Sequence, residues 1–358
     1  MDAKERPFGG GPAGSKEDRA VDPIVQQTFS RFFDGVPVSA QIVDTSRGDR
    51  DMRKTAVVTA DDGERYVLKF AANDFTFPDR IRVWQRTAEE YRRLGYYCPR
   101  IYGDRSGAFP AIEYEGRTCF VHGEEFSKYR TLEDRTADGS QDGPDSRTYA
   151  RDVWTMTAKI AAKRLAYTSY PSAYCLFETF CPSDETDEVM ENALAWRKLA
   201  FALPEPFSAQ VRRIWDLWSD NRRALQARYA ELPASVFQAD LNPTNLLVGE
   251  DGAFKGVYDF NLCGRDVFLN YLMRENYDGF EKEIDLIREA LSVACGHYAF
   301  SEAEKAAALP LYRCLKPLWY TRVCELQEAG EDADRIRRCL DRIEYYLTAD
   351  IDFKSYMG

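Results

Sequence analysis

Strand-like and helix-like segments are separated along this 358-residue chain, and their order limits the possible fold more than any other feature of the sequence. Between residues 37 and 123, short runs of β-branched and aromatic residues alternate with turns. From about residue 145 onward, apolar residues recur instead at helical spacing. The sequence therefore predicts an α+β fold, in which a small antiparallel sheet with one helix precedes a larger, mainly helical lobe across a cleft.

The predicted strands of the first lobe occupy residues 37–43, 54–60, 64–70, 109–115 and 117–123. Asp62-Gly63 and Glu115-Gly116 are turn dipeptides that predict hairpins between neighbouring strands. One helix is expected among these strands, over residues 79–94, because apolar residues recur there every three or four positions.

The predicted helices of the second lobe cover residues 147–167, 187–201, 208–229, 267–275, 280–297, 302–328 and 332–347. One stretch with strand character, residues 236–260, interrupts them. We expect a flexible tail over residues 1–22, a first lobe over 23–126 and a second lobe over 127–358, with an acidic loop over 133–146 near the join.

Composition argues against several classes of protein. No apolar run is long enough to span a bilayer, and the Gly-, Pro- and charge-rich start lacks the apolar segment of a signal peptide. Nine cysteines without a CxxC pair, together with only two histidines, predict reduced cytoplasmic thiols and no structural zinc site. A formal charge of −11 disfavours nucleic acid as the partner and weakly favours a cationic small molecule.

The stretch VFQADLNPTNLLVGEDGAFKGVYDFN, residues 236–261, carries the polar residues with the clearest chemistry. Its apolar strands form a predicted hairpin that brings Asn245, at the entrance, close to Asp259, at the exit. Two oxygen-bearing side chains at one point are suited to Mg²⁺, which fills its other positions with water and substrate phosphate. Asp240 could face the same point, although each residue taken alone is also typical of a turn or a cap.

This stretch resembles the catalytic loop and metal-binding strand of aminoglycoside phosphotransferases and choline-kinase-like small-molecule kinases, which have a bilobal, protein-kinase-like fold. The resemblance implies that Asp240 is the catalytic base and that Asn245 and Asp259 bind the metal ion. In the following segment RDVFLNYL, Asp266 and Asn270 stand at the two acidic positions of a further family element. Gln238 is a departure, because the family has histidine there to support the loop. A glutamine amide can also donate and accept hydrogen bonds.

The resemblance extends in outline to the first lobe. Lys69 ends a strand as the family's phosphate-binding lysine does, and it implies a partner glutamate on the next helix, Glu90 or else Glu89. In the polar loop over residues 44–51, Ser46 and Gly48 are expected to lie over the phosphates of the nucleotide.

The segment HGEEF, residues 122–126, stands where the family has the hinge between lobes. Glu124 and Glu125 are therefore candidates for nucleotide binding through the backbone that would read adenine.

Together these residues imply an ATP- and Mg²⁺-dependent phosphotransferase that acts on a hydroxyl group of a small molecule, possibly a cationic one such as an aminoglycoside or an amino alcohol. The motif does not select the acceptor. Two other interpretations stay open. A non-catalytic nucleotide-binding module would account for Gln238, and a protein kinase is disfavoured because no activation loop follows Asp259.

Overall fold

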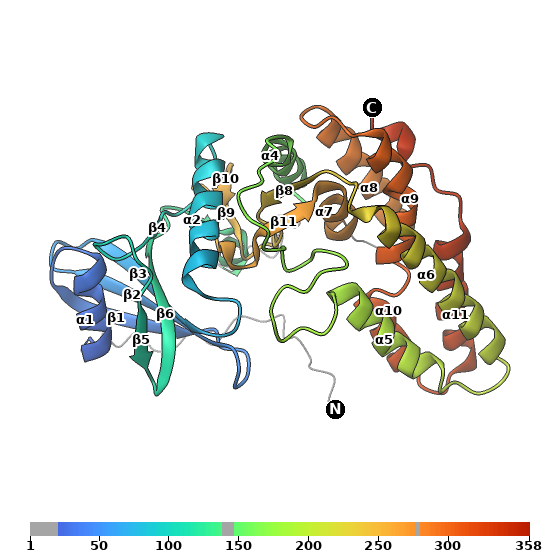
Figure 1. Cartoon of the computed structure of the whole chain (residues 1–358), viewed down its shortest axis with the longest axis horizontal. Coiled ribbons are helices and arrows are strands. Elements are labelled where there is room, and N and C mark those ends of the chain that lie inside the picture. The colour runs from blue at the N-terminus through green and yellow to red at the C-terminus, as the bar shows by residue number, and fades with distance from the viewer. Residues whose placement is uncertain (1–20, 138–146, 277–279) are drawn as a thin grey trace. The chain divides into compact units, whose positions relative to one another are not determined.

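The computed structural model describes residues 21–137, 147–276 and 280–358, so residues 1–20 of the predicted tail and most of the predicted acidic loop lie outside the described residues. The chain divides into two compact units, Met1–Ala71 with Tyr102–Phe126, and Ala72–Ile101 with Ser127–Gly358 (Figure 1). An antiparallel sheet dominates the first unit and helices dominate the second, which confirms the predicted α+β class.

The first unit is a twisted sheet with one covering helix. Its elements are α1 (Pro23–Phe32), β1 (Pro37–Asp44), β2 (Met52–Ala60), β3 (Arg65–Ala72), β4 (Ile101–Tyr102), β5 (Ala111–Tyr114) and β6 (Arg117–Glu125). The strands follow the order β1-β2-β3-β6-β4, and β5 also pairs with β6. All the predicted strands of this unit are present, whereas the two-residue β4 was not predicted.

Helix α1 was not predicted either, although its start carries recognisable signals. The Asp22 side chain accepts hydrogen bonds from the backbone of Ile24 and Val25, and proline follows at the first helical position. The aromatic rings of Phe29 and Phe33 lie 5.5 and 4.6 Å from the ring of Tyr66 on β3. Helix α1 therefore covers one face of the sheet.

The second unit contains the remaining helices and three small strand pairings. Its helices are α2 (Pro78–Arg93), α3 (Leu132–Ala137), α4 (Ala150–Ala162), α5 (Glu188–Ala200), α6 (Ser208–Tyr229), α7 (Phe268–Glu275), α8 (Phe280–Cys295), α9 (Glu302–Leu315), α10 (Tyr320–Ala329) and α11 (Ala333–Thr348), with short 3-10 turns η1 (Phe260–Leu262) and η2 (Lys354–Tyr356). Its strands are β7 (Arg130–Thr131), β8 (Ala234–Phe237), β9 (Leu246–Val248), β10 (Phe254–Val257) and β11 (Gly264–Val267). Among these, β9 pairs with β10 and β7, and β8 pairs with β11.

The expected division placed α2 with the first lobe, but its contacts group it with the second unit. The buried guanidinium of Arg80 donates to the carbonyl oxygens of Phe180 (2.7 Å) and Pro171 (2.8 Å). About two helical turns further along α2, the Thr87 hydroxyl lies 2.7 Å from the Tyr167 hydroxyl. These contacts span about eighty to one hundred residues of sequence, so no local pattern could have assigned the helix to a unit.

Two predicted helices are shorter than expected, each for a backbone reason. The helix predicted over 302–328 is two helices, α9 and α10, because Pro317 has no backbone N–H to continue the helical hydrogen bonds and Trp319 then takes an extended ψ of 154°. The helix predicted over 147–167 ends at Ala162, and Arg164 then takes a left-handed φ of 50°. Residues 163–187 then form an irregular segment that leads to the start of α5.

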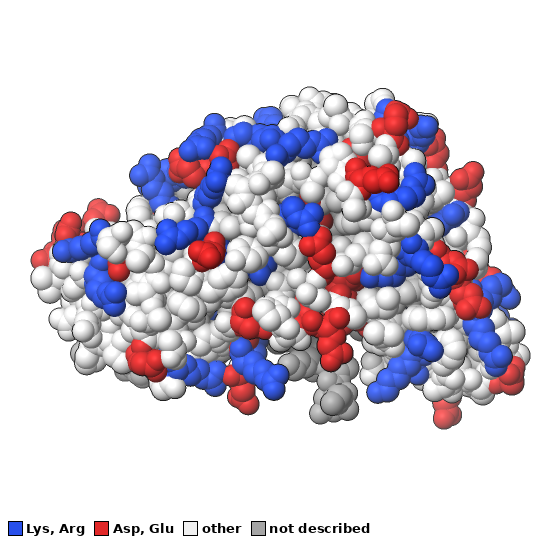
Figure 2. Space-filling view, in the orientation of Figure 1, with Lys and Arg blue, Asp and Glu red and all other residues white. Residues whose placement is uncertain are grey.

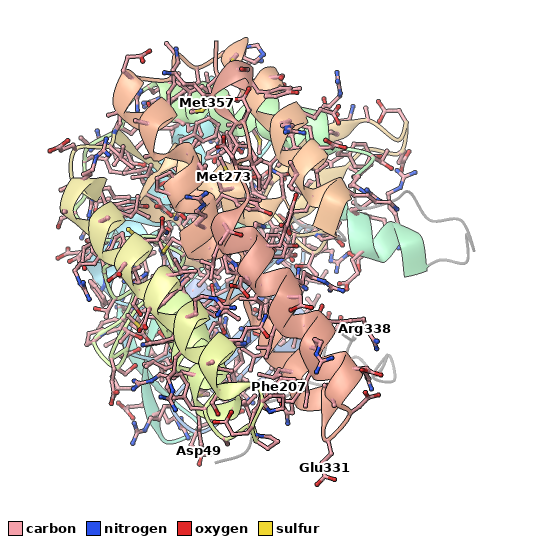
Figure 3. All side chains as sticks on the ribbon, turned by 90° about the vertical axis from the view of Figure 1, so that its right-hand side faces the viewer. Asp49, Phe207, Met273, Glu331, Arg338 and Met357 are labelled. Atoms are coloured by element: carbon pink, nitrogen blue, oxygen red, sulfur yellow. The ribbon has the colours of Figure 1, made fainter. Side chains whose placement is uncertain are left out.

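In the helical unit, α6 and α11 run side by side (Figure 3). Gln210 on α6 donates to Asp341 (2.8 Å) and Glu344 (2.9 Å) on α11, and Trp218 is buried beneath. The tryptophan indole donates to the Cys314 carbonyl oxygen at 3.0 Å. Trp218 thus packs within the helical core, whereas Trp215 on the same helix is half-buried.

Acidic and basic side chains are interspersed over most of the face seen in Figure 2. Within the part of the chain that the structure describes, no helix is long and apolar enough to cross a membrane. All nine cysteines are free thiols, as expected from their spacing.

Candidate active site

The β9-β10 hairpin brings Asn245 and Asp259 together, as its sequence predicted. In the hairpin register Leu246 faces Val257, and the backbone N–H of Tyr258 donates to the Asn245 carbonyl oxygen at 3.1 Å. The two proposed metal ligands therefore flank the open end of one hairpin. Gly256 lets the backbone of Tyr97 approach, because a Cβ at this position would lie 1.9 Å from the Tyr97 carbonyl oxygen.

Asp240 lies beside this hairpin end and is held by three side-chain donors. Asn242 donates to Asp240 Oδ1 at 2.9 Å, and the Tyr174 hydroxyl donates to the same oxygen at 3.3 Å. Asn245 Nδ2 donates both to Asp240 Oδ2 (3.2 Å) and to the Asp240 carbonyl oxygen (2.9 Å). The carboxylate orientation is thus fixed from two sides.

Burial raises the pKa of Asp240, and the nearby Asp259 carboxylate raises it further, while hydrogen bonds from Asn242 and Tyr174 act in the opposite direction. Asn245 links the two segments, because its side chain donates to Asp240 and its carbonyl oxygen accepts from the backbone of Tyr258, the residue before Asp259. A raised pKa makes a carboxylate a better proton acceptor, which suits a general base.

Asp259 has an unusual backbone conformation. Its φ and ψ angles, 59° and 71°, lie in the left-handed region, which is costly for most residues and least so for Asn, Asp and Gly. Such strain persists where the surrounding structure fixes the conformation, and it is common at functional sites. The turn into η1 thereby places the Asp259 carboxylate at the hairpin exit.

Gln238 joins the catalytic loop to the backbone that carries Asp259. Its side chain is fully buried, and its Oε1 accepts from the Asp240 N–H at 3.2 Å. Its Nε2 donates to the carbonyl oxygens of Tyr258 (3.2 Å) and Asp259. The glutamine therefore makes the supporting hydrogen bonds that the resemblance assigns to histidine, and its presence does not by itself argue for an inactive site.

Replacing Gln238 by leucine should lower the free energy of unfolding by about 3 kcal/mol, because a buried N–H and two buried carbonyl oxygens lose their partner. Thermal or denaturant unfolding would measure the change. Gln210→Leu is the matched control, because Gln210 bonds only at the surface of α6 and its loss should cost about 0.5 kcal/mol or less. Equal effects of the two substitutions would contradict the bridging role of Gln238.

Asp266 and Asn270, which stand at the two acidic positions of the further family element, are buried and hydrogen-bond to other parts of the second unit. Asp266 Oδ2 accepts from the Ser172 hydroxyl at 2.7 Å, and Asn270 Nδ2 donates to both Asp266 and the Tyr174 carbonyl oxygen. Burial raises the pKa of Asp266 to about 6, although these hydrogen bonds oppose the rise. Asp266 and Asn270 together hold the segment that carries Tyr174, through Ser172 and the Tyr174 carbonyl oxygen.

Tyr174 and Arg274 border the site and were missed by sequence reasoning. The Arg274 guanidinium lies 3.2 Å from the centroid of the Tyr174 ring and donates to Glu188 Oε2 at 3.0 Å. Tyr174 reaches Asp240 from 66 residues away in sequence, out of an irregular segment without a motif. Nothing local in the sequence distinguishes it from the other 20 tyrosines.

The nucleotide-binding candidates of the first unit lie on β3, β6 and the loop after β1. Lys69 Nζ is 3.0 Å from Glu124 Oε2, and both are on the sheet. Ser46 is held within its loop, because the Arg53 N–H donates to the Ser46 hydroxyl at 3.0 Å. Gly48 has a φ of +71° and open space around it. Their binding of nucleotide, and that of Glu125, stays a prediction.

Glu90 is buried on α2 in the second unit. It forms ion pairs with Lys163 and with Arg93, one helical turn away, whereas Glu89 is half exposed and lies 3.8 Å from Arg92. Burial raises the pKa of Glu90, but the hydrogen bond and charge of Lys163 outweigh it and hold the pKa below its usual value. A pairing of Glu90 with Lys69 stays a prediction.

The residues at the hairpin suit a magnesium ion that also binds phosphates. No group of three or more His, Cys, Asp or Glu side chains among residues 21–137, 147–276 and 280–358 could hold a metal ion by itself. Mg²⁺ is typically held by one or two carboxylates together with substrate phosphates and water. One amide oxygen from Asn245 and one carboxylate from Asp259 match that donor set.

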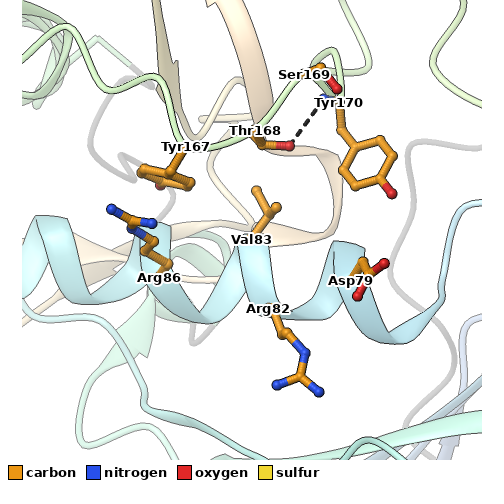
Figure 4. Close-up of a pocket in the computed structure, with 8 residues that line it drawn as sticks. All are labelled: Asp79, Arg82, Val83, Arg86, Tyr167, Thr168, Ser169 and Tyr170. Atoms are coloured by element: carbon orange, nitrogen blue, oxygen red, sulfur yellow. Dashed lines mark hydrogen bonds between the residues drawn. The ribbon is translucent and has the colours of Figure 1, made fainter.

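A surface cavity of about 390 Å³ lies between α2 and residues 167–170 (Figure 4). Arg86 lies 4.0 Å from the centroid of the Tyr167 ring, whereas Arg82 points away from residues 167–170. The two guanidinium groups do not converge, and none of the predicted site residues lines the cavity.

A family model described as the phosphotransferase enzyme family matches residues 47–269, which is more than half of the chain. No curated protein matches the sequence. Two solved structures share the fold: amicoumacin kinase hAmiN in complex with AMP-PNP, Ca²⁺ and Ami (TM-score 0.53, 14% identity, 92% of this chain and 96% of that chain covered), and the microcompartment-associated aminopropanol kinase (0.52, 16%, 90% and 94%). These likenesses confirm the predicted fold.

Proposed function

Because this chain belongs to the phosphotransferase enzyme family, we propose that it transfers the γ-phosphate of ATP to a hydroxyl group of a small molecule, with Mg²⁺ as the metal ion. The observation that carries the proposal is the arrangement of Asp240, Asn245 and Asp259 around one hairpin end. Kinases among the structural relatives, one of them bound to AMP-PNP and Ca²⁺, support the same chemistry.

Asp240 is the proposed base. Donors on both of its oxygens fix the carboxylate in one orientation, so that it can align the acceptor hydroxyl and accept its proton as the phosphoryl group moves. The raised pKa of this carboxyl group favours that proton transfer. Little covalent chemistry is required of the protein, because alignment and charge stabilisation supply most of the acceleration in phosphoryl transfer.

Asn245 and Asp259 are the proposed metal ligands, through one amide oxygen and one carboxylate. When bound, Mg²⁺ neutralises charge on the β- and γ-phosphates. The hydrogen bond from Asn245 Nδ2 to Asp240 Oδ2 fixes the amide so that its oxygen points away from Asp240. The same asparagine therefore orients the base and offers a ligand.

In the first unit, Lys69 is proposed to hold the α- and β-phosphates, with Ser46 and Gly48 lying over them. The backbone of Glu124 and Glu125, at the end of β6, is proposed to bind adenine. On α2, Glu90 is the glutamate to which the resemblance gives the pairing with Lys69.

The proposed acceptor is a small molecule with a free hydroxyl group, and a cationic one, such as an aminoglycoside or amino alcohol, suits the net charge of −11. Aminopropanol and amicoumacin kinases among the relatives support small-molecule acceptors as a class. Neither relative selects the acceptor for this chain, because both are below 25% identity.

The proposal is tested by ADP release from Mg²⁺-ATP in the presence of aminoglycosides, amino alcohols, sugars and nucleosides. We expect release that requires one acceptor class and falls to the background without acceptor or after chelation of the metal. The Asp240→Asn variant serves as the inactive control. Binding of Mg²⁺-ATP without transfer to any acceptor would favour the non-catalytic alternative.

A further inference from the structure

One face of the first unit's sheet carries a largely buried cluster of charged and polar side chains on β3 and β6. In the β3-β6 register, Lys69 faces His122 and Val67 faces Glu124. Because side chains alternate across a strand, these four share one face. Gly123 belongs to the opposite face, where a Cβ would lie 2.6 Å from the Phe33 ring under α1.

Lys69 and Glu124 are diagonal neighbours on that face, at a separation that long side chains bridge. Lys69 Nζ lies 3.0 Å from Glu124 Oε2, and His122 Nε2 lies 3.4 Å from Glu124 Oε1. Each carboxylate oxygen of Glu124 therefore has a basic neighbour. The Glu124 side chain is only 9% exposed and that of Lys69 is 19% exposed, so solvent screens the pair little.

Burial alone would raise the pKa of Glu124, but the Lys69 ammonium and the hydrogen bond with His122 outweigh it and hold the pKa at about 2. Glu124 is consequently an anion throughout the physiological pH range. A buried anion requires a fixed cation, and here the cation is the lysine proposed to hold the phosphates.

We infer that the Glu124 side chain is a positioning residue for Lys69 and fixes the ammonium group for the phosphates of the nucleotide. The inference rests on the proposed function and assigns to β6 the part that the resemblance gives to a glutamate on α2. Glu90, that glutamate, is engaged by Lys163 and Arg93 within the second unit. The role is separate from that of the Glu124 backbone, which is proposed to bind adenine.

The test compares two ligands that differ only in their phosphates. Dissociation constants for ADP and for adenosine, measured by calorimetry on the full chain, give a phosphate selectivity that depends on Lys69 and not on the adenine contacts. We expect Glu124→Gln to lower this selectivity by about tenfold, the usual effect of losing a hydrogen bond between charged groups, with adenosine affinity unchanged.

Glu115→Gln is the matched control, because Glu115 pairs with Lys54 at 3.2 Å in the same unit and has no proposed part in nucleotide binding. It should leave the selectivity unchanged. Lys69→Met should reproduce the loss, and the double variant should lose no more than Lys69→Met alone, because the two residues act as one unit. Thermal midpoints of all variants distinguish this effect from a loss of folding.

Three results would overturn the inference: unchanged selectivity in Glu124→Gln, tighter ADP binding that marks Glu124 as a competitor of the phosphates, or an equal loss for adenosine. If Glu90→Gln lost the phosphate selectivity and Glu124→Gln did not, Glu90 on α2 would be the residue that positions Lys69. Because the readout is binding, it stands apart from the proposed transfer reaction. A protein that binds ADP selectively but phosphorylates no acceptor would contradict only the proposed function.

Discussion

Asp240→Asn should reduce phosphoryl transfer by about a thousandfold, the effect of removing a positioned general base. The substitution keeps the shape of the side chain and one accepting oxygen, but its amide nitrogen cannot accept from a donor, and it removes the charge that accepts the hydroxyl proton. Nucleotide affinity should change by less than about threefold, since Asp240 is not a proposed ligand of metal or phosphate. Steady-state kinetics together with ADP binding would separate the two effects.

The control for this variant is Asp220→Asn, which removes an exposed carboxylate of α6 that is paired with Arg223. It should keep the wild-type rate. Full transfer activity in Asp240→Asn would show that another group accepts the proton or that none is needed. A parallel loss of ADP binding would indicate instead that the substitution disturbs the loop.

Asp259→Asn should lower kcat/KM by a factor on the order of a thousand, because a carboxylate ligand is lost where charge on the phosphates must be neutralised. Asparagine tolerates the left-handed backbone of residue 259, so the change tests the charge and not the conformation. The specific readout is the effect of Mg²⁺ on ADP affinity. In the wild type Mg²⁺ should strengthen ADP binding, and in the variant this strengthening should be lost.

Asp251→Asn provides the comparison within the same hairpin. Asp251 lies in the exposed turn and pairs with Lys255 at 2.8 Å, so its replacement should leave both the rate and the effect of Mg²⁺ unchanged. If Mg²⁺ strengthened ADP binding equally in Asp259→Asn and in the wild type, the metal-ligand role of Asp259 would be wrong.

Much of the fold followed from local sequence patterns. The strands of the first unit and helix α6 were predicted because alternation and helical spacing are properties of neighbouring residues. Helix α1 is not among the predicted helices because its Asp-Pro start ends the Gly-, Pro- and charge-rich segment that predicts a flexible tail. The apolar spacing over 302–328 predicts one continuous helix, but the chain leaves helical geometry at Trp319, two residues after Pro317.

The candidate site divides in the same way. Asp240, Asn245 and Asp259 could be placed together from sequence because all three belong to one loop and hairpin within 20 residues. The contacts that support these three residues could not be predicted from the sequence. The Gln238 N–H donates to the Tyr91 hydroxyl from 147 residues away, and Tyr174 reaches Asp240 across 66 residues.

The sequence by itself determined the α+β class, the hairpin that gathers the polar residues and the family to which they point, because these depend on residues close together along the chain. Only the tertiary structure decided that α2 packs with the second unit, that Gln238 bridges the loop to Asp259, and that Glu124 pairs with Lys69. The reason is physical: such contacts depend on strand register and on helix packing, which bring distant residues together without leaving a local pattern.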